Sequence, residues 1–113
     1  MYASRRSPAL LLSEVKNYRP AQPEKSSWKD VIERVDGMED DGHVSKLVRA
    51  LAHGEKACGA WEGGKGFLVE GDMWRTVANM VVDSVAVGGP TWVRSCGFEE
   101  AWEEVPEREG ARL

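Results

Sequence analysis

The stretch that decides the fold is Asp72–Val87, which reads DMWRTVANMVVDSVAV. Asp72 is suited to cap the start of a helix over residues 73–87, and Gly88-Gly89-Pro90 ends it. A helix that is apolar over so much of its circumference usually lies at the centre of its domain. The stripe expected to face the core is Trp74, Val77, Val81, Ser84 and Val85, widened by Met73, Met80 and Val82.

Two shorter helices are predicted before this one. The first begins after Ser26 or Ser27, carries Trp28 on its apolar face and ends at Asp36-Gly37. The second is capped by Asp41 and stops at Gly54. Because only a few residues join them, an antiparallel pair is the simplest arrangement.

The remaining pattern predicts strands. Ala57–Glu62 and Gly66–Glu70 flank a glycine-rich turn and form a predicted hairpin, and Thr91–Cys96 is a predicted third strand. A strand is also one interpretation of residues 9–18, and a short helix is expected from Phe98 to Val105. The predicted fold class is therefore α+β, a small antiparallel sheet packed against three to four helices. Exposed edges of such a sheet favour a homodimer.

Charge divides the 113 residues into three parts. Residues 1–25 have a net charge of +3 and are expected to form a flexible basic arm and linker, residues 26–105 a single domain, and residues 106–113 a disordered acidic tail. The whole chain has a net charge of −4. No apolar run approaches the roughly 20 residues of a transmembrane helix, and the run Ala9–Leu12 is too short for a signal peptide. These features favour a cytoplasmic protein.

The residues that bind metals or react covalently form no recognisable set. The soft ligands are spaced too irregularly for a structural zinc site, and Gly63–Gly66 lacks the full phosphate-loop pattern. Ser95 is not part of a nucleophile elbow. The sequence therefore predicts no enzyme, no catalytic residues, no cofactor and no metal. The soft ligands are His43, His53, Cys58 and Cys96.

Tryptophan is abundant, with five in the chain. Tryptophan and arginine are enriched where proteins bind one another, so the leading hypothesis is a small interaction protein, such as an adaptor, an inhibitor or a viral or phage antagonist. The alternative is an RNA-binding module in which exposed tryptophans stack on bases and basic side chains contact phosphates. The candidate binding residues are Trp28, Trp61, Trp92, Arg94, Arg5, Arg6, Lys16 and Arg19.

A third hypothesis is a nuclease-like enzyme. Glu14-Val15-Lys16 resembles the second half of the PD-(D/E)xK nuclease motif, which implies a metal-binding Glu14 and a Lys16 near the attacked phosphate. Such chemistry needs a second carboxylate on a preceding strand, and no Asp or Glu precedes Glu14.

Overall fold

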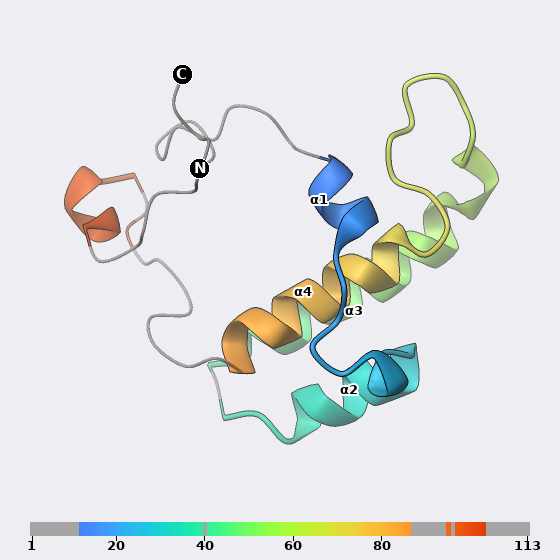
Figure 1. Ribbon diagram of the computed structural model, residues 1–113. Helices are drawn as coiled ribbons and strands as arrows, with labels where there is room; N and C mark the ends of the chain where they lie inside the picture. Colours follow the sequence, from blue (N-terminus) through green and yellow to red (C-terminus); the bar gives the residue numbers. More distant parts are fainter. Residues whose placement is uncertain (1–11, 40, 87–94, 96, 104–113) are drawn as a thin grey trace. The chain divides into compact units, whose positions relative to one another are not determined.

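A computed structural model of the chain describes residues 12–39, 41–86, 95 and 97–103 (Figure 1). The chain divides into two compact units, one over Leu12–Val87 and one made from Met1–Leu11 with Gly88–Leu113. The described residues of the first unit contain four α-helices, and those of the second contain one short 3₁₀ helix, η4 (Glu99–Trp102). The expected divisions at residues 25 and 105 stay predictions.

The first unit is built around α4 (Met73–Ala86), as the sequence predicted. This helix contacts α1, α2 and α3, so three segments share its surface (Figure 1). Its burial removes apolar side chains from water, which is the main force that holds such a unit together. The buried apolar residues are Val31 from α2, Val44 and Val48 from α3, and Met73, Ala78 and Val82 from α4.

Helix α2 (Trp28–Asp36) begins and ends where its sequence indicated. Ser27 is the N-cap and forms a capping box with Asp30. The Ser27 hydroxyl accepts a hydrogen bond from the Asp30 backbone N–H, and the Asp30 carboxylate accepts one from the Ser27 backbone N–H. The C-cap is Gly37, and its φ of −86° is right-handed, so the helix ends at this glycine without the left-handed conformation that glycine often adopts there. The indole of Trp28, at the start of α2, bonds Glu55 near the end of α3, as an antiparallel pair requires.

Helix α3 (His43–Cys58) passes through the residue that was expected to end it. Its N-cap is Gly42, not Asp41, and the Asp41 carboxylate instead contacts the His43 imidazole. Gly54 lies against α4, where a Cβ built on it would stand 2.5 Å from Cζ3 of Trp74. The glycine is therefore a point of close helix contact, and that packing offsets its poor helix propensity.

The predicted α+β fold class was wrong, because the part of the chain that the structure describes is helical and contains no strand. The hairpin over 57–70 is replaced by the end of α3, a 3₁₀ turn η3 (Gly59–Trp61) and a loop with left-handed glycines at 63 and 66. Those glycines do make turns, but the residues beside them continue a helix or stay irregular. The strand at 91–96 lies outside the described residues except for Ser95.

Helix α1 (Leu12–Asn17) lies where a strand over 9–18 was one interpretation. Leu12 and Val15 are three residues apart, so a helix places them on one face, and α1 packs on α4. A six-residue segment has too few residues for its period to be decided without that contact. With no sheet edge among the described residues, the argument for a homodimer loses its basis, and dimerisation stays a prediction.

The buried face of α4 also differs from the predicted stripe. Ser84 is exposed and Trp74 is half-buried, whereas the polar Asn79 and Asp83 are buried. Hydrophobicity alone orients a helix by its apolar residues, but here polar residues are buried because other segments supply their partners.

Two further observations concern the rest of the described chain. The short helix expected from Phe98 is the 3₁₀ helix η4, and its predicted end at Val105 lies outside the described residues. None of the helices described is long and apolar enough to cross a membrane.

Candidate functional site

Asp83, on the buried face of α4, has polar contacts to two other segments of the first unit. Its Oδ2 accepts hydrogen bonds from the Tyr18 hydroxyl at 2.6 Å and from the Ala21 backbone N–H at 3.0 Å. Nη2 of Arg34, on α2, lies 2.8 Å from Oδ1. One carboxylate therefore joins α4, α2 and the segment that follows α1.

Burial and these partners act on the two acids in opposite ways. For Asp83, burial raises the pKa, but the hydrogen bonds from Tyr18 and Ala21 and the Arg34 guanidinium outweigh it, so the pKa is lowered. For Tyr18, burial and the bond to the Asp83 carboxylate raise the pKa to about 12. At neutral pH the pair is a neutral phenol donating to a carboxylate.

Asn79 lies one helical turn before Asp83 and extends the same polar cluster. Its Nδ2 donates to the Ser26 carbonyl at 3.0 Å and to the Arg75 carbonyl at 3.0 Å. The residue is 1% exposed, so its bond to Ser26 fixes the chain just before α2. Four buried side-chain atoms of the described residues have no hydrogen-bond partner, although the last of them forms the ion pair with Arg34: Nη1 of Arg34, Nε1 of Trp74, Oδ1 of Asn79 and Oδ1 of Asp83.

The role of this cluster is to hold the helices together. Asp83 is 7% exposed, its Oδ2 accepts two hydrogen bonds and its Oδ1 forms the ion pair with Arg34, so the contacts of its carboxylate lie within the fold. The sequence analysis did not single out Asn79 or Asp83, which lie within the apolar repeat of α4. Their four-residue spacing on one face was the available signal.

A pocket of about 360 Å³ lies where the start of α2, the end of α3 and the start of α4 meet. Trp28 and Glu55 form one part of its lining through a 3.0 Å hydrogen bond from the indole. Arg75, whose Nη2 is 3.2 Å from Oδ1 of Asp72, forms another. The pocket thus combines an aromatic ring, carboxylates and a guanidinium, which suits a polar aromatic molecule. Its remaining lining residues are Gly59, Glu62 and Gly71.

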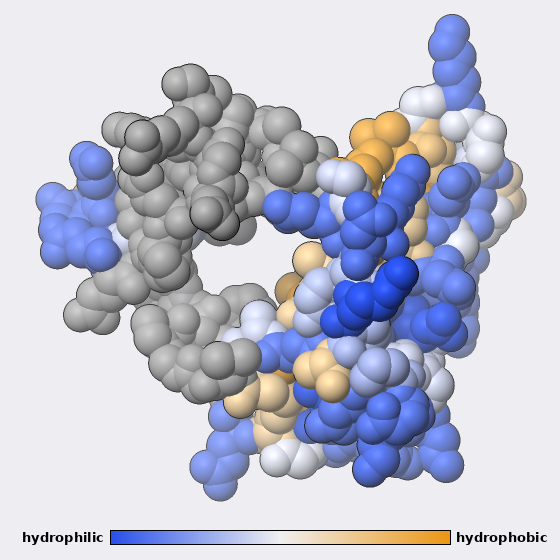
Figure 2. Space-filling model, in the orientation of Figure 1, coloured by the Kyte–Doolittle hydropathy of each residue, from blue (hydrophilic) through white to orange (hydrophobic). Residues whose placement is uncertain are grey.

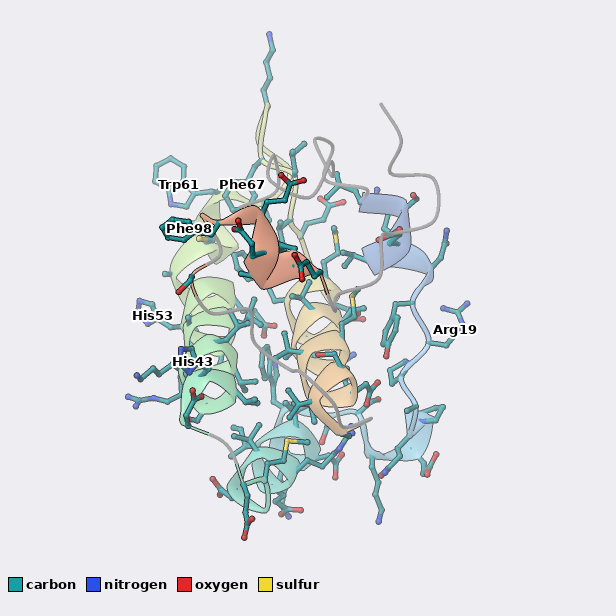
Figure 3. All side chains as sticks on the ribbon, turned by 90° about the vertical axis from the view of Figure 1, so that its left-hand side faces the viewer. Arg19, His43, His53, Trp61, Phe67 and Phe98 are labelled. Atoms are coloured by element: carbon teal, nitrogen blue, oxygen red, sulfur yellow. The ribbon has the colours of Figure 1, made fainter. Side chains whose placement is uncertain are left out.

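The predicted binding residues are dispersed in the structure. Trp61 is 69% exposed, and Arg19 lies on the opposite side of the first unit (Figure 3). Lys16 is exposed on α1, while Trp28 is half-buried and bonded to Glu55. No common surface joins these four described residues. The other predicted residues, Arg5, Arg6, Trp92 and Arg94, lie outside the described part of the chain.

Exposed apolar side chains near Trp61 cover only a small area of the surface (Figure 2). Leu68, in the loop between η3 and α4, is 58% exposed, and an orange region lies over this loop in Figure 2. The rest of the coloured surface in that view is mainly hydrophilic. Among the described residues, no group of three His, Cys, Asp or Glu side chains is arranged to hold a metal ion. His53 is exposed within α3, not at its end.

Known proteins similar to this chain are fungal oxidases. A family model described as questin oxidase-like matches residues 1–51. A Baeyer–Villiger oxidase of Pestalotiopsis microspora is 42% identical over 106 residues, which cover 89% of this chain and 23% of that protein. A Baeyer–Villiger oxidase of Emericella nidulans is 37% identical over 99 residues, covering 86% and 22%. The questin oxidase of Aspergillus fumigatus is 35% identical over 111 residues, covering 93% and 24%.

The chain spans about a quarter of the length of the curated relatives it matches. No solved structure matches it. The similarity covers nearly all of the chain at more than 30% identity, so it is not confined to a short motif.

These relatives overturn the functional hypotheses drawn from the sequence. The non-enzymatic interaction protein, in its adaptor, inhibitor and viral or phage forms, was wrong, because the similar proteins are named as oxidases. The RNA-binding module is not supported for the same reason. The nuclease hypothesis also fails on geometry, because Glu14 and Lys16 are exposed on helix α1 and the described residues contain no strand that could carry a second carboxylate. The prediction that the protein is not an enzyme was therefore a mistake, made because no compact catalytic motif is visible.

Proposed function

We propose that this protein takes part in a Baeyer–Villiger oxidation, the insertion of one oxygen atom between a ketone carbonyl and a neighbouring carbon. The observation that carries the proposal is its similarity, along nearly the whole chain, to several proteins named for this reaction. Another relative is named questin oxidase, so questin is the substrate to test first.

The atoms and electrons of this reaction must balance. Molecular oxygen supplies one atom to the new ester, and the other atom leaves as water. Two electrons and two protons are needed for that water, so a hydride donor must be present. The described side chains with tight polar contacts hold the helices together, and we assign the buried cluster around Asp83 to that task and not to the reaction.

Within this proposal, the ketone binds in the pocket beside Trp28. The indole offers a flat apolar surface, and the Arg75 guanidinium can donate to a carbonyl oxygen. A volume of about 360 Å³ lies within the range of small-molecule sites. Arg75 is exposed enough to exchange its partner Asp72 for a ligand, because the Arg75 side chain is 38% exposed and that of Asp72 is 85% exposed.

The experiment supplies the purified protein with questin or a cyclic ketone, a reduced nicotinamide nucleotide and ¹⁸O₂. The expected product is an ester that is one oxygen heavier than the ketone and carries the label. Arg75→Gln should weaken ketone binding, followed by tryptophan fluorescence, whereas Arg19→Gln removes the same charge far from the pocket and should not.

Two results would overturn different parts of the proposal. An absence of labelled ester, with every other component active in a control oxidase, would refute the reaction. Labelled ester formed equally well by both arginine variants would keep the reaction and refute the pocket.

A further inference from the structure

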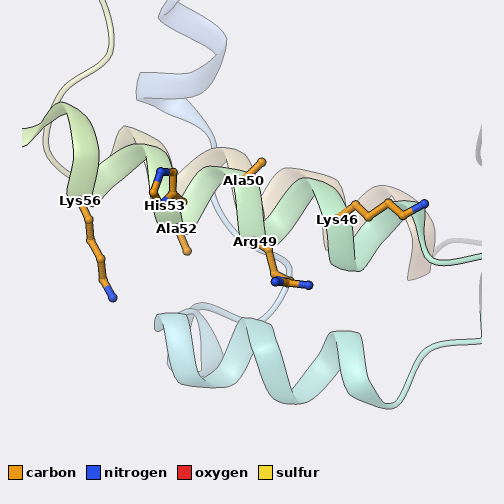
Figure 4. A pocket seen from close by; sticks show the side chains of 6 residues that line it. All are labelled: Lys46, Arg49, Ala50, Ala52, His53 and Lys56. Carbon is orange, nitrogen blue, oxygen red and sulfur yellow. The ribbon is translucent and has the colours of Figure 1, made fainter.

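The outward face of α3 carries a row of basic residues. Lys46, Arg49, His53 and Lys56 follow one another at intervals of three, four and three residues (Figure 4). In an α-helix this spacing places them on one face, and ten residues span about 15 Å. Each of the four is exposed. We call this row the basic face of α3.

Three residues of the basic face, Lys46, Arg49 and Lys56, have no acidic partner among the described residues, and the same is true of Lys16, Arg19, Lys25 and Lys65. Arg34, Arg75 and Lys29 each form an ion pair within the described residues. Like charges at such spacing repel one another and destabilise an isolated helix by about 0.2–0.5 kcal/mol per pair. An anion on this face would relieve that repulsion.

An open depression lies over this face of α3. Ala50 and Ala52 lie between the basic residues, and with them line a pocket of about 610 Å³. Their small side chains leave the surface of the helix accessible between the longer basic ones (Figure 4). A volume of this size lies within the range of small-molecule sites.

We propose that the basic face of α3 binds a small molecule that carries two or more phosphate groups. Lysine and arginine are the usual partners of phosphate oxygens, and their bonds to anions are stronger than neutral ones. Lys46, Arg49 and Lys56 place three positive charges along about three turns of the helix, which fits several linked charges better than a single carboxylate. This inference does not depend on the oxidase proposal, because it concerns binding and not turnover.

The test is a titration of the ¹⁵N-labelled protein with inorganic pyrophosphate and tripolyphosphate, followed by amide shifts at low and moderate salt. We expect saturable shifts on α3, tighter binding of tripolyphosphate, and weakening as salt screens the charges. Arg49→Glu/Lys56→Glu should weaken binding at least about tenfold, which is the loss of one charge-assisted contact. Lys16→Glu/Lys29→Glu makes the same change of charge elsewhere and should change it less than about twofold.

Three outcomes would overturn the proposal. The first is no saturable shift with either phosphate, and the second is equal weakening by both double variants. The third is tighter binding of a short oligonucleotide than of a polyphosphate of equal charge, which would indicate an extended polymer as the ligand. All four substituted residues are exposed, so the variants should fold, and their helical circular dichroism checks this.

Discussion

The replacement Asp83→Asn tests whether the first unit depends on its buried carboxylate. The new side chain keeps the size of the old one but removes the charge that faces Arg34, whose side chain is only 16% exposed. Breaking a buried pair leaves an uncompensated charge and costs about 3–5 kcal/mol. The hydrogen bonds from Tyr18 and Ala21 also lose their charged acceptor.

The expected size of the effect is a large part of the total stability. Small domains unfold with about 5–15 kcal/mol, and each kcal/mol shifts Tm by about 4–8 °C in a domain of this length. A loss of 3 kcal/mol therefore predicts a fall in Tm of at least about 12 °C. Urea unfolding followed by circular dichroism and tryptophan fluorescence measures the free energy directly.

The pH dependence of stability provides a second test of this prediction. Because the pKa of Asp83 is lowered in the folded state, its contribution is present above the unfolded pKa of about 3.9 and is lost as pH falls through the folded value. The difference in unfolding free energy between wild type and Asp83→Asn should therefore shrink below about pH 4.

A matched control is Asp36→Asn, which removes the same charge from an exposed position at the end of α2. It should change stability by less than about 0.5 kcal/mol. The reasoning is refuted if Asp83→Asn is as stable as this control at neutral pH. The double variant Arg34→Gln/Asp83→Asn should cost less than the sum of its parts, because the stranded guanidinium is gone.

Three further replacements and titrations probe other contacts. Gly54→Ala should destabilise the protein by about 1 kcal/mol despite the better helix propensity of alanine, because its Cβ would meet Trp74; denaturant unfolding that shows stabilisation would contradict the close packing. The pKa of Tyr18, raised to about 12, should appear as a late phenolate absorbance absent from Tyr18→Phe; its stabilising effect is present below about pH 10 and is lost as pH rises further, so titration at an ordinary pH would argue against the bond to Asp83. Trp28→Phe keeps an aromatic side chain, although a smaller one, and removes the 3.0 Å bond from the indole to Glu55, so it should cost at least about 1 kcal/mol in denaturant unfolding. An unchanged midpoint would show that the bond adds nothing.

Local signals in the sequence located the helices best where they were strongest. The capping box at Ser27 and Asp30 satisfies backbone groups within four residues, so α2 began where predicted. The long apolar repeat of α4 likewise needs no partner to be recognised. The predicted sheet failed because short apolar runs fit a strand or a helix equally well, and Gly54 was interpreted as a stop without knowledge of Trp74.

The candidate site was less accessible to sequence reasoning than the helices. Trp28 was selected for its type and does line the pocket beside Arg75, but Arg75 itself carried no recognisable pattern. The residues of that pocket come from three helices and a loop. Their proximity depends on how the helices cross, which no local spacing encodes.

Local signals in the sequence predict the position and extent of α2 and nearly all of α4, because capping and periodic burial act over a few residues. Only the tertiary structure decided which face of α4 is buried. Burying Asp83 and Asn79 costs free energy because both lose their contacts with water. Tyr18, Arg34 and Ser26, from distant parts of the chain, offset that cost by contacting them. The burial of a polar group depends on its partners, and those partners are brought together by the fold.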